Sequence, residues 1–417
     1  MKNNFWKALG PGIMWAGAAV GVSHLVQSTR AGAGYGFDLV LIVILINLFK
    51  YPFFEFGPRY AIASGESLVH GYKRLGKWAV WLFMALTLGT MFTIQATVTS
   101  VTVGILSSVF PGIMSFQGWI VLVFSLCILI VAIGKYKALD RVVKAIIIIL
   151  SLSTVVAVLA ASAKGFNPNP VFMTKFTWKA ADLAFLIALA GWMPSAIDIS
   201  VWHSIWTIEK IKNTGYKPKL SESLLDFKIG YIGTTILALC FLALGALCMY
   251  GTGITFANNG TEFSTQLFNL YTTTIGRWAY PIIALAATAT MFSTTLTVMD
   301  AYPRVMKPVT QIIIPALDNP KYEKYISYFW LTALISISFL IMTAFAKEMR
   351  ILVDIATTLS FITAPILGYL NYKAVTGRNI SPEYQPGTGL KVMSVIGLIV
   401  LFAFAIYFLS SYIFKFF

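Results

Sequence analysis

Long apolar runs follow one another along the chain, most of them near the ~20 residues that a helix needs to cross a bilayer. They lack the ~10-residue alternating pattern of strands in a membrane barrel. Because only helices and closed barrels satisfy their backbone polar groups in lipid, we expect an all-α polytopic membrane protein. The eleven expected transmembrane helices are centred on Met14–Gln27, Leu39–Phe54, Trp81–Leu106, Trp119–Ile133, Val142–Ala160, Leu183–Trp202, Ile229–Met249, Pro281–Val298, Tyr328–Phe345, Leu352–Tyr369 and Val392–Phe414.

Two of these spans combine glycine and proline with polar side chains. The first contains Gly10-Pro11-Gly12, Gly17 and Gly21, and the sixth contains Gly191, Pro194 and Asp198. This composition is typical of interrupted helices, which membranes tolerate where the chain lines a cavity or is buried in protein. Close packing of helices at small residues is the alternative explanation.

The two unusual spans lie five spans apart, which is the spacing of two inverted five-helix repeats with broken first helices. We therefore expect a five-plus-five inverted repeat (LeuT-like), with helices 1 and 6 broken. The repeats would cover roughly 8–163 and 180–373, with an extra helix at roughly 391–415. The whole chain, 1–417, would form one transmembrane domain, and the polar stretches Glu209–Phe227 and Gly251–Thr274 would be connecting loops.

Composition and charge agree with a membrane location. Hydrophobic residues make up 58% of the chain and charged residues 11%, and the mean hydropathy is +0.78. The net charge of +15 comes mostly from Lys and Arg in loops on the same side as the N-terminus. This distribution follows the positive-inside rule and leaves no basic patch for nucleic acid. It predicts a cytoplasmic N-terminus and an outside C-terminus in a plasma membrane, the bacterial inner membrane, with lipid as a partner.

The sequence contains no sign of an enzyme. A nucleotide-binding loop, a His-Glu-x-x-His motif and a nucleophile–base pair are all absent, which also argues against an ATP-driven pump. Cys127, Cys240 and Cys248 lie within the expected spans, so a disulfide framework or thiolate site is not expected. We expect no cofactor.

Charged side chains inside the spans are rare and call for an interpretation. Lys50, Glu55 and Arg59 at the end of the second span suggest a helical ladder of ion pairs. Asp300 and Arg304 have the same four-residue spacing at the end of the eighth span. We interpret both groups as structural or gating contacts.

Several short motifs resemble the NRAMP divalent-metal transporters, which have the five-plus-five fold. Gly10-Pro11-Gly12 is followed by the segment 30–37 (Arg-Ala-Gly-Ala-Gly-Tyr-Gly-Phe). This segment is similar to the Gln-Ala-Gly-x-x-Tyr-Gly-Tyr-like stretch that NRAMP proteins have at the same distance from their Gly-Pro-Gly. Ser293-Thr294-Thr295-Leu296-Thr297 resembles its Ser-Ser-Thr-Ile-Thr segment, and Met193-Pro194 and His203-Ser204 resemble parts of its sixth helix. The resemblance implies a secondary-active importer of a divalent metal cation.

The departures from the family pattern concern the metal site. The Asp-Pro-Gly-Asn break of the first helix falls on Gly21-Val22-Ser23-His24, so its carboxylate is a glycine here. The third-span segment Thr93–Thr97 lacks the family's carboxylates. The chain therefore resembles a divergent, bacterial-type member with an altered substrate site.

The register of the sixth helix has two possible alignments. Aligning Met193 with the family's methionine keeps a thioether ligand and puts Ser195 at the histidine. Aligning His203-Ser204 instead puts Ala196 at the methionine and Asp198 at the histidine. Both alignments stay open.

The expected substrate-binding residues come from both breaks, and some of them are also candidate metal ligands. His24, Met193 and Asp198 could bind metal, and Asp198 alone would add negative charge. Coupling to H+ or Na+, or gating, is expected from His203, Ser293, Thr294 and Thr297. The substrate-binding set is Gly21, Ser23, His24, Gln27, Met193, Ser195, Ala196 and Asp198.

Two other functions compete with metal import. The same fold could carry a small organic solute, enclosed by aromatic side chains, with sodium or proton coupling. A non-transporting receptor or scaffold on this fold is the third hypothesis. The aromatic candidates are Trp15, Trp192, Trp202 and Trp206.

Overall fold

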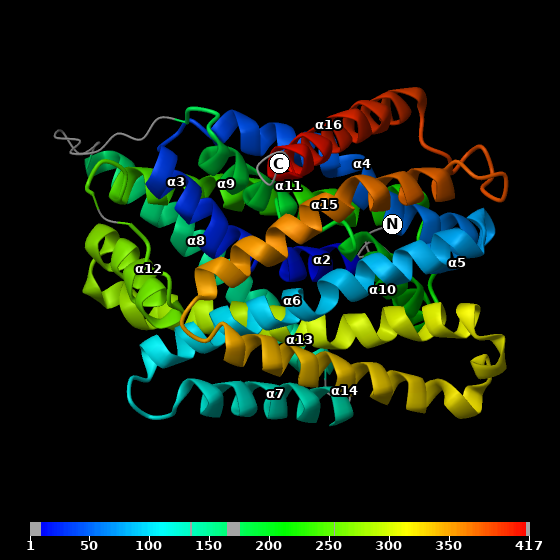
Figure 1. The fold of residues 1–417 in the computed structure, drawn as a ribbon, viewed down its shortest axis with the longest axis horizontal. Helices are drawn as coiled ribbons and strands as arrows, with labels where there is room; N and C mark the ends of the chain where they lie inside the picture. The colour runs from blue at the N-terminus through cyan, green and yellow to red at the C-terminus, as the bar shows by residue number, and fades with distance from the viewer. Residues whose placement is uncertain (1–9, 134–135, 165–175, 254, 414–417) are drawn as a thin grey trace.

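The computed structural model describes residues 10–133, 136–164, 176–253 and 255–413. Within these residues the chain is helical and contains no strand. Most helices run along the long axis of the molecule, with α7 and α14 along one side, α4 and α16 along the other, and α2 and α10 between them (Figure 1).

The eleven expected spans are all present. Seven helices are long and apolar enough to cross a membrane unaided, and three shorter apolar helices accompany them. In chain order the spans are α2 (Pro11–Ala19) with η1 (Ser23–Ser28) and α3 (Thr29–Tyr35), α4 (Val40–Ser64), α6 (Lys77–Val109), α7 (Phe116–Ile133), α8 (Tyr136–Lys164), α9 (Ala180–Gly191) with α10 (Ile199–Thr214), α11 (Leu220–Cys248), α13 (Tyr280–Ile313), α14 (Pro320–Ala344), α15 (Met349–Val375) and α16 (Thr388–Ile413).

Large apolar side chains cover the outer surface of the bundle. Leu41, Leu159, Leu285, Leu340 and Ile406 are each more than 60% exposed. A surface of this kind is stable in contact with lipid tails, whereas water-soluble monomers rarely expose contiguous apolar patches of more than a few hundred Å².

Both stretches expected as loops are largely helical. In Glu209–Phe227 only residues 215–219 lie outside α10 and α11, which extend into the stretch from either side. The stretch Gly251–Thr274 includes most of α12 (Gly260–Ile275), which contacts α6 and α8. The Asn259 side chain caps this helix by accepting a hydrogen bond from the Glu262 N–H at 2.8 Å. Its apolar side, including Phe263 and Tyr271, is buried. The loop prediction failed there because apolar residues at helical spacing are interleaved with threonines. The remaining short helices are α5 (Leu68–Leu75), η2 (Arg277–Ala279) and η3 (Pro315–Leu317).

The first and sixth spans are broken as expected. Helix α2 ends at Ala19, and Val20 has an extended backbone (φ −75°, ψ 93°) before the wide π-helical turn η1. Helix α9 ends at Gly191, and the chain is unwound until α10 begins at Ile199. The two breaks meet near the centre of the bundle, where α2 contacts α10.

Glycine also permits close packing beside the breaks, so the alternative explanation of these glycines holds in part. A Cβ at Gly191 would lie 1.8 Å from the Thr357 carbonyl oxygen on α15. A Cβ at Gly32 would lie 1.9 Å from the Leu242 carbonyl oxygen on α11. No other residue fits at these two helix crossings, which fix the broken spans against their neighbours.

Candidate functional site

A cavity of about 30 Å³ lies where the two breaks meet α6 and α13. Every side chain that lines it is buried. This volume holds about one water molecule or one small ion. The lining residues are Ala19, Val22, Ser23, Ile94, Val98, Trp192, Ser195, Ala196, Asp198, Ile199, Trp202, Thr294 and Val298.

Five of the expected substrate-binding and coupling residues line this cavity together. Ser23 comes from the first break, Ser195, Ala196 and Asp198 come from the sixth, and Thr294 comes from α13. The local sequence explains the convergence. Both spans lose regular helical hydrogen bonding at the same depth, so side chains from opposite spans meet at one point.

Asp198 is the cavity's most chemically distinctive group. It precedes the first residue of α10, and it is 6% exposed. Its Oδ2 atom accepts a hydrogen bond from the Tyr302 hydroxyl at 2.9 Å. Its Oδ1 atom has no hydrogen-bond partner among the described residues. A buried carboxylate oxygen without a partner is costly, so this atom is suited to bind a cation or a proton.

Ser23 and His24 form a chain of hydrogen bonds to α11. His24 Nε2 lies 2.9 Å from the Thr234 carbonyl oxygen, which only accepts, so Nε2 carries the hydrogen. In a neutral ring Nδ1 then accepts, and the single hydrogen of the Ser23 hydroxyl is shared between Nδ1 at 2.8 Å and the Ala19 carbonyl oxygen at 2.9 Å. Both ring nitrogens of His24 are engaged, and the ring does not line the cavity. The hydroxyl oxygen of Ser23 keeps lone pairs for a ligand.

Gly21 fits a close approach of α13. A Cβ added at this position would lie 3.1 Å from both Oγ1 and Cγ2 of Thr294. The Thr294 hydroxyl lies 3.4 Å from the Val20 carbonyl oxygen and 3.0 Å from that of Thr290. The Thr294 side chain therefore occupies the space that a longer side chain at position 21 would need.

Met193 lies away from the cavity. Its side chain is fully buried in an apolar cluster with Ala31, Leu39, Val43 and Leu189. The thioether therefore does not contribute to the donor set of the cavity in this conformation. The candidate metal ligands Met193 and His24 are not brought together with Asp198.

The other coupling candidates are spread over neighbouring positions. His203 is fully buried beside the Phe227 ring, 5.8 Å between centroids, and neither ring nitrogen has a partner among the described residues. Thr297 is buried and Ser293 is half-buried, and neither lines the cavity. In the third span, Gln95 donates to the Thr295 carbonyl oxygen at 3.4 Å.

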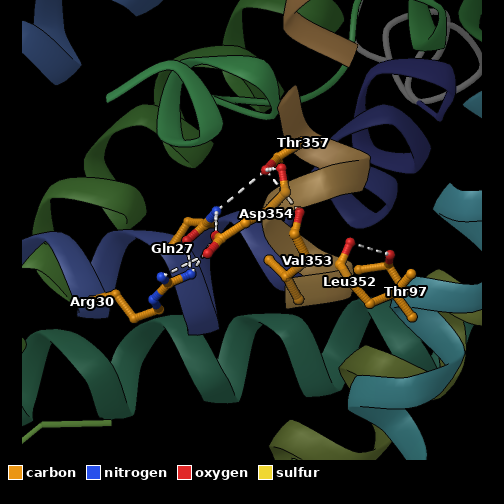
Figure 2. A network of polar contacts seen from close by, with 7 residues as sticks. All are labelled: Gln27, Arg30, Thr97, Leu352, Val353, Asp354 and Thr357. Carbon is orange, nitrogen blue, oxygen red and sulfur yellow. Dashed lines mark hydrogen bonds and ion pairs between the residues drawn. The ribbon is translucent and has the colours of Figure 1, made fainter. Parts of the chain in front are cut away.

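Gln27 belongs to a polar network at the end of the bundle where α3 ends and α15 begins. Figure 2 shows Arg30 reaching across to Asp354, with Nη1–Oδ1 and Nη2–Oδ2 distances of 2.7 and 3.1 Å. Gln27 accepts from Arg30 at 2.7 Å and donates to Asp354 at 3.3 Å and to Thr357 at 3.4 Å. The network ties the first broken span to α15.

The opposite end has a larger polar cavity of about 640 Å³ between α5, α10, α13 and α14. The expected Asp300–Arg304 pair is present at 2.6 Å, and Arg304 also bonds Glu209 on α10 at 2.6 Å. Glu66 and His70 line this cavity outside the membrane spans. A hydrogen bond from Arg74 holds the pKa of Glu66 below its ordinary value, and burial lowers the pKa of His70.

At the end of α2 on this side, the backbone is fixed by Asp226 of α11. This carboxylate accepts hydrogen bonds from the Gly10 N–H at 3.3 Å and the Gly12 N–H at 2.6 Å. A carboxylate at a helix N-terminus is favourable because the first N–H groups of the helix have no internal partner. The interaction holds the beginning of the first span against α11.

The ion-pair ladder expected on α4 is only half present. Arg59 bonds Glu55 at 2.5 and 3.0 Å, but Lys50 turns the other way. Its ammonium donates to the carbonyl oxygens of Ala190, Gly191 and Ser195 at 2.9, 3.1 and 2.8 Å. A single lysine in an apolar run indicates from the sequence alone that Lys50 has a specific partner. That partner is not Glu55, because side chains five residues apart do not lie on the same face of a helix.

Two of the four tryptophans reach the cavity. Trp192 and Trp202 line it, and the Trp192 Nε1–H donates to Ser360 Oγ at 2.7 Å. Trp15 instead packs with Phe54, Phe227 and Tyr231, and Trp206 packs edge-on against Trp202.

Comparison with known proteins identifies relatives of similar length. A protein of Pasteurella multocida (strain Pm70), described as uncharacterized, is 38% identical over 409 residues, which cover 97% of this chain and 92% of that protein. The model of the natural resistance-associated macrophage protein-like (Nramp) family matches residues 12–411.

Solved structures share the fold at low identity. A manganese transporter of Eremococcus coleocola, in complex with an aromatic bis-isothiourea substituted compound, superposes with a TM-score of 0.64 at 13% identity. The match covers 98% of this chain and 87% of that one. MhsT in complex with L-phenylalanine has a TM-score of 0.62 at 15% identity, covering 95% and 98%. These matches confirm the LeuT-like architecture that the sequence predicts.

The family match extends over nearly the whole chain, including both broken spans and the eleventh helix. Members of this family are membrane transporters and not enzymes, in agreement with the expectation from the sequence. The chain belongs to the natural resistance-associated macrophage protein-like family of multi-pass secondary transporters.

Proposed function

We propose that this chain carries a small divalent metal cation into the cell, and that the cation binds in the cavity between the two breaks. The observation that carries the proposal is Asp198, which lines an ion-sized cavity and whose buried Oδ1 atom has no hydrogen-bond partner among the described residues. Such an atom is stabilised when a cation binds to it. Family membership and the similar fold of a manganese transporter support a metal cargo.

The donor set of the cavity favours a hard cation. Ser23, Ser195, Asp198 and Thr294 offer oxygen atoms, and the sulfur of Met193 is elsewhere. Oxygen ligands suit Mg²⁺ and Mn²⁺, whereas thioethers and thiolates select softer ions. We therefore propose Mn²⁺ or Mg²⁺ as cargo in preference to Cd²⁺. One carboxylate balances half of a divalent charge, and carbonyl oxygens of the unwound segments complete the ligand set.

An organic solute suits this conformation less well. Small-molecule sites usually enclose roughly 300–1,000 Å³, far more than this cavity. Trp192 and Trp202 would have to move apart to admit an apolar body. A receptor that transports nothing is the remaining alternative, and the uptake assay below separates it from a carrier.

Coupling and orientation complete the proposal. We propose coupling to H+ or Na+, with the Thr294 hydroxyl and the Val20 carbonyl oxygen as the two groups that contact the coupling ion.

The N-terminus would be cytoplasmic and the C-terminus outside, in a bacterial inner membrane, because basic residues concentrate on the N-terminal side. The inverted repeats would cover roughly 8–163 and 180–373, with the extra helix at roughly 391–415. In this orientation the Arg30–Asp354 network closes the outer side.

Uptake by proteoliposomes tests the function. We expect Mn²⁺ or Mg²⁺ to accumulate above protein-free vesicles, and Asp198→Asn to lower uptake about 10- to 100-fold, since interactions with a charged group contribute roughly 1.5–3 kcal/mol. The matched control is Asp318→Asn, which changes an exposed carboxylate on the loop before α14 and should leave uptake unchanged.

Three outcomes would contradict the proposal. If none of the tested cations enters, the protein is not a metal carrier and the receptor hypothesis gains support. If Asp198→Asn transports as well as the wild type, the cation binds elsewhere. A stronger uptake of Cd²⁺ than of Mn²⁺ and Mg²⁺ would show that a soft ligand takes part.

A further inference from the structure

Lys50 is a fully buried lysine near the middle of the apolar helix α4. A charged side chain at such a position is expensive and calls for a specific partner. All three N–H donors of its ammonium group find carbonyl oxygens, those of Ala190, Gly191 and Ser195, at 2.8–3.1 Å. The side chain is therefore held by backbone atoms of the sixth span.

These carbonyl oxygens are available because the sixth span is broken. Ala190 and Gly191 are the last two residues of α9, where carbonyl groups have no partner inside the helix. Ser195 lies in the unwound segment before α10. The negative end of the α9 dipole and a third carbonyl thus converge on one point. Such a cluster of backbone oxygens is the kind of site that binds a free cation in broken membrane helices.

The surroundings also favour a positive charge at this point. The ammonium nitrogen lies 5.8 Å from the centroid of the Phe54 ring, within the range of a cation–π interaction. Asp198, three residues after Ser195, attracts the charge of Lys50. The ammonium group thus has a desolvated position with backbone and aromatic partners.

We propose that the carbonyl oxygens of Ala190, Gly191 and Ser195 form a monovalent-cation site, which the ammonium group of Lys50 occupies as a tethered ion. The site adjoins the cavity that Asp198 lines and shares Ser195 with it, but Lys50, Ala190 and Gly191 do not line that cavity. It holds the broken sixth span to α4 and replaces a freely diffusing ion. The proposal does not depend on the identity of the transported substrate.

Replacement of the side chain tests this inference. In Lys50→Ala the oxygens lose their cation and a small free volume opens, so Na+, K+, NH4+ or methylammonium should bind there and raise the melting temperature of the purified protein saturably. Choline, which is too large, should not. The melting temperature of the wild type and of Lys324→Ala, an exposed lysine on α14, should respond equally little to these salts. Lys50→Met, which fills the space without charge, should melt lower and gain nothing from any cation.

Two melting results would overturn the inference. One is a Lys50→Ala protein that melts like the wild type without added cations. The other is a destabilised Lys50→Ala protein that no small cation stabilises more than choline does. If Lys50→Ala is not recovered in choline buffer, its recovery as a monodisperse protein in each salt becomes the measurement. Recovery in a small-cation salt supports the site, whereas failure in every salt, with Lys50→Arg recovered, contradicts it. The melting experiment uses no divalent metal, so a failed uptake assay in the test of the proposed function would leave its result unchanged.

Discussion

At the scale of single residues, buried polar atoms rather than sequence motifs define the site. Asp198 was predictable as a candidate because it is the one acidic residue in an otherwise apolar span, and the structure places it in the lining of the cavity. Side-chain direction was not predictable. Met193 and Ser195 are two residues apart in an unwound segment, where helical periodicity no longer indicates which side chains share a face. Lys50 was misjudged because its partners are carbonyl oxygens, which no sequence pattern reveals.

Met193 provides a test at this scale. Because its side chain packs among Ala31, Leu39 and Leu189 and not in the cavity, Met193→Leu should leave the relative uptake of Mn²⁺, Mg²⁺ and Cd²⁺ unchanged. The near-isosteric exchange should lower the free energy of unfolding by less than about 1.5 kcal/mol. Competition uptake assays measure the selectivity. A changed preference between Mn²⁺ and Cd²⁺ would show that the thioether reaches the ion during the cycle.

At the scale of elements, the predicted spans and both breaks agree with the structure. Apolar run length and the placement of glycine and proline were sufficient, because lipid leaves few alternatives for the backbone. The helix α12 was missed since its buried side is interrupted by polar residues. Contacts between elements were also beyond prediction. Arg30 and Asp354 are far apart in sequence, and only the fold brings α3 and α15 together.

The link between α3 and α15 predicts a gating effect. The Asp354 side chain is 37% exposed, so its pair with Arg30 contributes roughly 0–1 kcal/mol, enough to bias an opening motion but not to hold the fold. Asp354→Ala should therefore speed the labelling of Ala196→Cys by a membrane-impermeant thiol reagent added to whole cells. Labelling rates are measured by mass spectrometry.

The control for this experiment is Glu262→Ala, which removes an exposed carboxylate at the same end of the bundle, on α12. It should not change the labelling rate. Equal rates with and without Asp354 would mean that the network is no gate. Labelling from the cytoplasmic side alone would contradict the proposed orientation.

At the scale of the whole molecule, the protein is a lipid-facing bundle with a small central cavity whose lining side chains are all buried. Arg30, Gln27 and Asp354 cover one end, and Arg304 with Glu209 joins α13 to α10 at the other. The family and topology were predictable from the sequence, and so was Asp198 as the only acidic candidate at the two breaks, whereas its place beside Ser23 and Thr294 in one cavity required the structure. Gly21 leaves room for Thr294, and the sixth span supplies the carboxylate.

The most direct test of this account locates the ion. Crystals of the protein soaked in Mn²⁺ should show an anomalous peak in the cavity within roughly 2.0–2.6 Å of Asp198 Oδ1, the range for oxygen ligands of hard cations. The same soak of Asp198→Asn should show none. An anomalous peak at another site that persists in Asp198→Asn, with the cavity empty in both proteins, would contradict the assignment of Asp198 as the ligand of the transported ion.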